Sequence, residues 1–176
     1  MRAGVVASLA RPGGNLTGSS IISTELTPKR LELLSELVPQ AKVIALLVNP
    51  NSPKSEPTIR DAREAARMMG LDLDILTATT GGEIDAAFAS LAQRQAGALI
   101  VGNDPFFDGR VEQLVALASR HAVPAIYYSR EFAASGGLIS YAPSFTAAYH
   151  QAGIYAGRIL KGEKAARSAG PAANDV

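Results

Sequence analysis

Short apolar runs alternate along this chain with segments of helical periodicity, and this alternation restricts the folds that the chain can adopt. The run Val43–Val48 is apolar throughout and rich in branched residues, and it ends at Asn49 and Pro50. Similar apolar runs cover residues 98–101, 124–128 and 138–141. Runs without a polar face are typical of strands covered on both sides, as in a parallel sheet between two layers of helices. Residues 71–76 instead alternate apolar and acidic side chains, which is typical of a half-exposed edge strand.

Helical stripes lie between these runs. Apolar residues at i, i+3, i+4 and i+7 predict helices that include residues 59–69, 84–91, 111–118 and 145–152. Helix boundaries are predicted at Thr27-Pro28 and Ser144, which are N-cap signals, and at Gly70 and Gly162, where helices commonly end. The resulting order across residues 28–161 is helix, βαβαβαβ, β, helix. This order predicts the α/β class, with a doubly wound and mainly parallel sheet.

Composition excludes several classes of function. The chain has 176 residues, with 17 basic and 16 acidic side chains, a net charge of +1 and no Lys/Arg-rich run, so we expect no nucleic-acid partner. It has no cysteine, and its two histidines, His121 and His150, both fall on predicted helices, which argues against a zinc site. The phosphate-loop, dinucleotide-loop and nucleophile-elbow motifs are absent from the sequence. We therefore predict a protein that is not an enzyme and that uses no cofactor or metal.

Polar segments follow the predicted strands, at the edge of the sheet where ligands bind in open parallel sheets. Asp104 is suited to pairing with an amino group and Arg130 to pairing with a carboxylate. Tyr127 and Tyr128 are candidates to stack on a ligand, although strand alternation would bury one of them. The alternative for each polar residue is an ordinary loop or capping role, since Asn, Asp, Ser and Pro are common in such loops. The segments comprise residues 49–52, 77–80, 102–105, 129–131 and 141–144.

Taken together, the ordered motifs resemble those of ABC transporter substrate-binding proteins, in the group that includes tryptophan- and tyrosine-binding receptors. The run from Gly4 to Gly18, GVVASLARPGGNLTG, resembles that family's GLVASLARPGGNVTG segment, and residues 29–39 resemble its KRLELLKELVP segment. The resemblance continues in register through most of the chain, at residues 48–51, 104–107, 123–127, 130–132, 136–141 and 159–164.

The resemblance implies a type I periplasmic-binding fold, in which two α/β lobes joined by crossover strands close on a solute. Residues 1–23 would then be the remnant of a first lobe and its crossover, residues 24–161 the second lobe, and residues 162–176 a disordered tail. We expect the chain to be a fragment that carries no export signal, from a family located in the periplasm or lipid-anchored outside the cytoplasm. Its partners would be a small solute and an ABC permease, and the isolated lobe would tend to self-associate.

The resulting functional hypothesis is the solute-binding component of an ABC importer, with an amino acid or a related compound as solute. Asp104 would meet a ligand amine, and amide side chains would bond the polar edges of the ligand. Two rivals stay open: a stand-alone enzyme that uses Asp104 and Glu131 as acid and base, and the ligand-binding core of a sugar-repressor-like regulator. The expected ligand-binding residues are Asn49, Asn103, Asp104, Glu131 and Tyr141.

Overall fold

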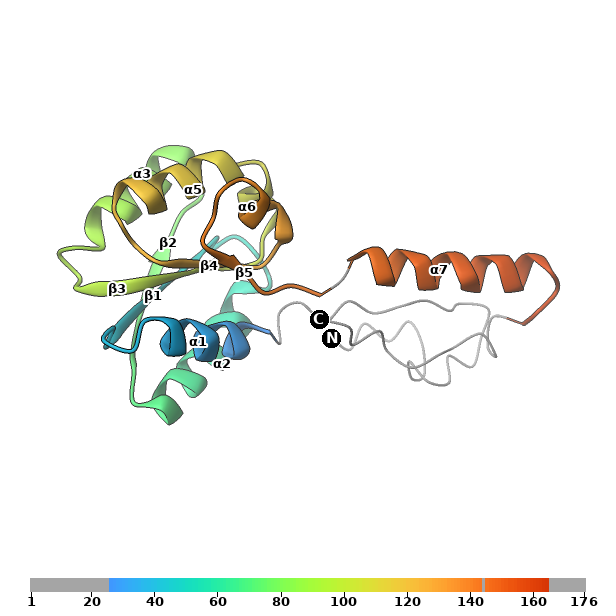
Figure 1. Ribbon diagram of the computed structural model, residues 1–176, viewed down its shortest axis with the longest axis horizontal. Helices are drawn as coiled ribbons and strands as arrows, with labels where there is room; N and C mark the ends of the chain where they lie inside the picture. The colour runs from blue at the N-terminus through green and yellow to red at the C-terminus, as the bar shows by residue number, and fades with distance from the viewer. Residues whose placement is uncertain (1–25, 144, 165–176) are drawn as a thin grey trace. The chain divides into compact units, whose positions relative to one another are not determined.

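The computed structural model of the chain describes residues 26–143 and 145–164 (Figure 1). The chain divides into two compact units, of which one is Ser23–Ala142 and the other combines residues 1–22 with residues 143–176. The second unit contains the long helix α7 (Phe145–Leu160), as the apolar stripe at 145–152 predicts. The expected lobe remnant at 1–23, the cap at Ser144 and the tail from residue 165 onward lie outside the described residues, and the domain boundaries stay predictions.

A five-stranded sheet forms the centre of the first unit, with all of its strands parallel and in the order β2-β1-β3-β4-β5. The strand β1 pairs with β2 in an unbroken register from Val43↔Asp72 to Val48↔Thr77. The alternating segment is an edge strand, as its pattern predicts. The strands are β1 (Val43–Val48), β2 (Asp72–Thr77), β3 (Ala96–Val101), β4 (Ala125–Tyr127) and β5 (Ile139–Ser140).

Helices cover both faces of this sheet, which confirms the predicted doubly wound α/β fold. Figure 1 shows α1 (Thr27–Leu37) and α2 (Ser55–Met69) on one face. The opposite face carries α3 (Gly81–Ser90), α5 (Val111–Arg120) and the short α6 (Arg130–Ala134). A single helical turn, α4 (Pro105–Asp108), follows β3.

The apolar runs of the central strands supply two cores at once, because successive strand residues point to opposite faces. Within β1, Ala45 and Leu47 join the cluster under α3 and α5, whereas Ile44 and Leu46 join the cluster over α1 and α2. The strand β3 divides its side chains in the same way. This double burial is the physical reason why the strands have no polar face.

The helix ends follow the sequence signals with one correction. Gly70 adopts the left-handed conformation (φ +67°) that ends α2, as expected. Thr27 was expected to be the N-cap of α1, but the cap position is Leu26 and no side chain caps the helix. Thr27 is instead a buried residue of the first turn, because it lies on the face that packs against the sheet.

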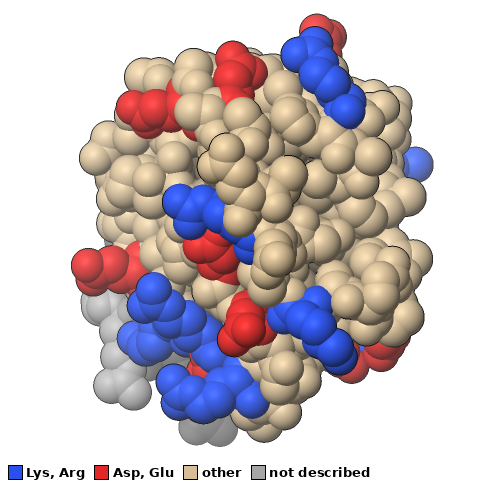
Figure 2. All heavy atoms as spheres, turned by 90° about the vertical axis from the view of Figure 1, so that its left-hand side faces the viewer, with Lys and Arg blue, Asp and Glu red and all other residues tan. Residues whose placement is uncertain are grey.

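Charges of both signs are interspersed on the surface. Figure 2 shows blue and red side chains mixed over one face of the molecule, in keeping with the net charge of +1. Several of them form exposed pairs, such as Arg94 with Asp74 at 2.9 Å and Lys29 with Glu32 at 2.9 Å. In the described part of the chain, no helix combines the length and apolar character needed to cross a membrane.

Candidate functional site

The carboxyl edge of the sheet gathers the polar loops into one row. Since all five strands are parallel, their carboxyl ends meet at the same edge, which is where open α/β sheets bind ligands. All five predicted ligand-binding residues follow a strand at this edge, four of them in loops and Glu131 in the first turn of α6. Asn49 follows β1, Asn103 and Asp104 follow β3, Glu131 comes four residues after β4, and Tyr141 follows β5.

Asn49 and Asp104 are brought into direct contact. The side-chain amide of Asn49 donates to Oδ1 of Asp104 at 2.8 Å, and the backbone N–H of Phe106 donates to the same oxygen at 3.0 Å. Asp104 is thereby the N-cap of α4 and ties the ends of two neighbouring strands together. Asn103 lines a small hollow of about 10 Å³ beside this pair, which has room for about one water molecule.

The surroundings of Asp104 favour its charged form. Burial raises the pKa of this carboxyl, but the hydrogen bonds from Asn49, Ser52 and the Phe106 amide, together with the charge of Lys54, leave the pKa below its ordinary value. Asp104 is therefore a carboxylate at neutral pH. A carboxylate can hold an ammonium group, but it has no proton to give as a general acid.

Tyr127 and Tyr128 are both buried, with 0% and 4% of their surface exposed, so the expectation that they stack on a ligand is wrong. Strand β4 ends at Tyr127, and Tyr128 therefore no longer follows the alternation that would turn it to the other face. Both rings pack on Phe132, Tyr127 stacked at 4.6 Å and Tyr128 edge-on at 5.3 Å between ring centroids. The hydroxyl of Tyr128 lies 2.6 Å from Oδ1 of Asp108 and 3.0 Å from the carbonyl oxygen of Asp104. The hydroxyl of Tyr128 thus stabilises the Asp104 loop by hydrogen bonding.

Tyr128→Phe should lower the free energy of unfolding by about 1–2 kcal/mol, because it removes the donor to the buried carbonyl oxygen of Asp104 and to the carboxylate of Asp108. Tyr127→Phe is the matched control, since no hydrogen-bond partner is found for the Tyr127 hydroxyl among the described residues. Tyr127→Phe should leave the free energy of unfolding unchanged or should raise it. Urea unfolding followed by circular dichroism measures both variants. Equal losses in the two would show that the Tyr128 hydroxyl does not support the loop.

Glu131 and Tyr141 stand apart from the Asn49–Asp104 pair. Glu131 is exposed, and its carboxylate accepts a hydrogen bond from the hydroxyl of Ser129. The backbone N–H of Tyr141 donates to the carbonyl of Tyr127 at 3.0 Å, which continues the β4–β5 pairing. Arg130, the other candidate for a ligand carboxylate, is exposed.

Arg30 is a residue of this edge that the sequence analysis missed. Its side chain is fully buried under the sheet, and Nε donates to the carbonyl oxygen of Tyr141 at 2.8 Å. Burial lowers the pKa of Arg30 to about 10, so the guanidinium keeps its charge at neutral pH. A signal was present in the sequence, because Thr27, Arg30, Leu31 and Leu34 have the i, i+3, i+4, i+7 spacing of the buried face of α1. The spacing places an arginine among the apolar residues of that face.

Metal binding finds no support among the residues that the structure describes, where no group of three or more His, Asp or Glu side chains could hold an ion. The chemistry that the carboxyl edge offers is therefore hydrogen bonding by amides and pairing with charged groups of a ligand.

Comparison with known proteins agrees with this fold. A tyrosine-binding protein of Clostridioides difficile is 26% identical over 164 residues, which are 93% of this chain and 46% of that protein. The structure of an ABC domain in complex with L-Trp from Streptococcus pneumonia matches with a TM-score of 0.74 and 21% identity, over 98% of this chain and 59% of that one. A conserved domain protein from Vibrio cholerae matches with a TM-score of 0.76 and 21% identity, over 93% of this chain and 54% of that one.

These two structures show a shared periplasmic-binding-protein-like fold. The chain spans about half the length of the relatives that it matches. The family described as ABC transporter substrate binding protein matches residues 1–170, nearly the whole sequence. The chain therefore belongs to the ABC transporter substrate binding protein family.

Proposed function

We propose that this chain provides one half of the solute-binding cleft of an ABC importer, and that the solute is an amino acid or a related small compound. The observation that carries the proposal is the row of polar residues at the carboxyl edge, with the Asn49–Asp104 pair held in a fixed geometry. A prearranged polar edge on a rigid sheet suits the recognition of a solute, because little ordering remains to be done on binding. The family assignment supports the same function.

In this proposal each predicted residue has a separate task. Asp104, which is charged and tied in place through Oδ1, meets a ligand ammonium group with Oδ2. Asn49 and Asn103 form hydrogen bonds with polar groups of the ligand. Glu131 and Tyr141 line the cleft on the side of β4 and β5. The relatives named for tyrosine and L-Trp motivate an aromatic amino acid as the first solute to try.

Capture would proceed by closure of two lobes around the solute. A solute that contacts both lobes stabilises the closed arrangement by its differential affinity, and an ABC permease would recognise that state. The whole protein would work outside the cytoplasm, in the periplasm or anchored to a lipid. The isolated half-cleft, with its polar edge uncovered, would tend to associate with a second copy.

Titration of the ¹⁵N-labelled 176-residue chain with L-tyrosine and L-tryptophan tests the proposal. We expect amide shifts confined to the loops 49–52, 102–105 and 129–131 and to Tyr141. N-acetyl-L-tyrosine lacks the ammonium group and should bind at least about threefold more weakly, since a hydrogen bond to a charged group is lost. Shifts located at the opposite edge of the sheet would refute the proposed site.

Glu131→Gln and Glu64→Gln form a matched pair for the same titration. Both side chains are exposed, but Glu64 lies in the second half of α2, away from the carboxyl edge. Glu131→Gln should change the affinity for L-tyrosine about three- to tenfold, whereas Glu64→Gln should leave it unchanged. Equal effects of the two variants would indicate a general charge effect and would remove Glu131 from the site.

A further inference from the structure

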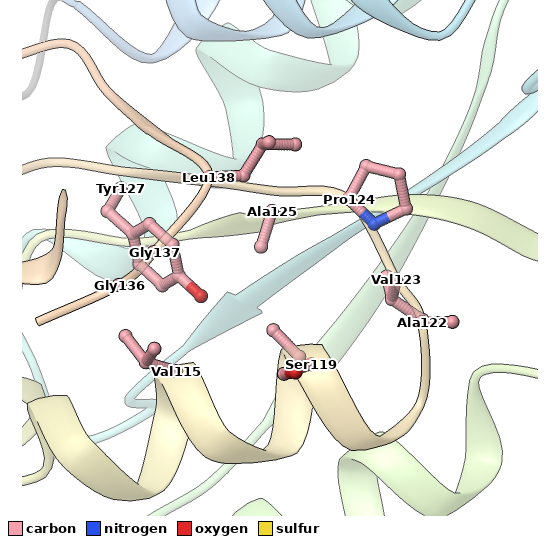
Figure 3. Close-up of a pocket in the computed structure, with 11 residues that line it drawn as sticks. Val115, Ser119, Ala122, Val123, Pro124, Ala125, Tyr127, Gly136, Gly137 and Leu138 are labelled. Carbon is pink, nitrogen blue, oxygen red and sulfur yellow. The ribbon is translucent and has the colours of Figure 1, made fainter.

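A second cavity, of about 300 Å³, lies near the amino ends of two strands of the sheet. It is formed by α5, by the turn that leads from α5 into β4, by β4 itself and by the segment Gly136–Leu138 in front of β5 (Figure 3). Because Pro124 precedes β4 and Leu138 precedes β5, the cavity borders the amino ends of these parallel strands. None of its lining residues belongs to the carboxyl-edge segments where the solute site is proposed.

The cavity wall contains a buried donor that no described residue satisfies. The side chain of Tyr127 is fully buried, and its hydroxyl has no hydrogen-bond partner among the described residues. Figure 3 shows this hydroxyl at the cavity wall, directed toward the side of α5 that carries Val115 and Ser119. A buried hydroxyl without a partner is uncommon in native proteins, because it has given up its hydrogen bonds to water without replacement. Burial raises the pKa of Tyr127 to about 12, so the group remains a donor at neutral pH.

Two glycines form part of the cavity wall. Gly136 has φ +97°, and a Cβ placed on it would lie 3.9 Å from Cγ1 of Val115, so a side chain there would project toward α5. At Gly137 a Cβ would lie only 2.8 Å from Cε2 of Tyr127 and 2.7 Å from the carbonyl oxygen of Phe132. The backbone of Gly137 therefore packs directly against the tyrosine ring, and no side chain can cover it. Gly136 therefore leaves space on the side of α5, whereas Gly137 permits the close packing of the backbone on Tyr127.

We propose that this cavity is a binding site for a small apolar ring compound that carries one hydrogen-bond acceptor, which accepts the hydrogen bond of the Tyr127 hydroxyl. The remaining lining favours an apolar body, since it is mostly aliphatic and leaves Leu138 with 61% of its surface exposed at the rim. The volume is at the lower end of the range for small-molecule sites, which limits the ligand to about one ring. A single donor in an apolar wall orients such a ligand in one way. The aliphatic lining residues include Val115, Ala118, Ala122, Val123, Pro124 and Leu138.

Two probes of nearly identical shape test the site. Cyclohexanone carries a carbonyl oxygen, and methylenecyclohexane replaces that oxygen with a carbon that accepts no such bond. In titrations of the ¹⁵N-labelled 176-residue chain, both should shift the amides of residues 119–123 and 136–138. The measured quantity is the ratio of ketone to alkene affinity, because the ketone gives up hydrogen bonds to water on binding and the alkene does not.

Two variants separate the hydrogen bond from the cavity itself. Tyr127→Phe should keep both probes bound and lower the ketone-to-alkene affinity ratio about two- to tenfold, which is the usual effect of one hydrogen bond. Ser119→Leu places a larger side chain on an exposed position of α5 at the cavity wall, and should abolish binding of both probes without unfolding the helix. An unchanged ketone-to-alkene ratio in Tyr127→Phe would overturn the assignment of the donor. Shifts away from residues 119–123 and 136–138, or full binding by Ser119→Leu, would overturn the site. Neither result would affect the solute cleft.

Discussion

Replacing Arg30 with alanine should lower the free energy of unfolding by about 2–4 kcal/mol. The side chain is among the largest that the structure buries completely, so its removal leaves a cavity between α1 and the sheet. The carbonyl of Tyr141 also loses the donor that lies 2.8 Å away. Urea unfolding of the 176-residue chain, followed by circular dichroism, measures the loss.

Arg30→Met separates the two contributions to this loss. Methionine fills much of the same volume without a charge, and replacing a buried charge by an apolar side chain of similar size is often neutral. We therefore expect Arg30→Met to retain most of the stability that Arg30→Ala loses. Equal losses in both variants would show that the guanidinium itself, and not its volume, stabilises this part of the fold. If Arg30 fixes the end of β5, hydrogen exchange of the Tyr141 backbone amide should be faster in both variants than in the natural chain.

Asp104→Ala should lower the free energy of unfolding by about 2–3 kcal/mol, because one substitution removes a helix cap and the acceptor of a partly buried amide. The Phe106 amide loses its cap, and the side-chain amide of Asn49 loses its partner. Asp104→Asn keeps an acceptor oxygen in the same place and should cost less than half as much. Urea unfolding at pH 7 compares the two variants, and equal losses would mean that the charge matters more than the acceptor.

The dependence of the free energy of unfolding on pH in the acid range gives an independent check on Asp104. Its folded pKa lies below the ordinary value of 3.8, so its contribution is complete above that value and is lost as the pH falls through the lower folded pKa. The difference in stability between the natural chain and Asp104→Asn should therefore shrink below about pH 4. A difference that persists undiminished at pH 2 would show that the carboxyl does not need to be charged in this fold.

The strands of this protein were predictable because their environment imposes a simple pattern. A strand such as β1 must supply apolar side chains to two cores, and the run Val43–Val48 therefore carries no polar residue. The alternation in β2 in the same way indicates an edge position, where one side of the strand is partly exposed. The helix stripes and the glycine end of α2 are equally local signals. The fold class was accessible for the same reason, since it rests on the order of these elements, whereas the family was indicated by the resemblance of segments such as residues 4–18.

The candidate site was only partly predictable. The rule that ligands bind at the carboxyl ends of parallel strands selects the loops, but it does not say which of their polar groups bond to each other. The pairing of Asn49 with Asp104, 55 positions apart, depends on β1 and β3 being neighbours in the sheet. The roles of Asn103, Glu131 and Tyr141 in binding stay predictions.

The sequence by itself determined the class of fold, the edge character of β2 and the segments that border the carboxyl edge, because hydrophobic period and turn residues are local properties of the chain. Only the tertiary structure decided that Tyr128 turns inward, that Arg30 reaches Tyr141 from 111 positions away, and that a cavity remains beside Tyr127. These features depend on which side chains meet after the sheet has assembled. That is a matter of packing between distant segments, which no local pattern encodes.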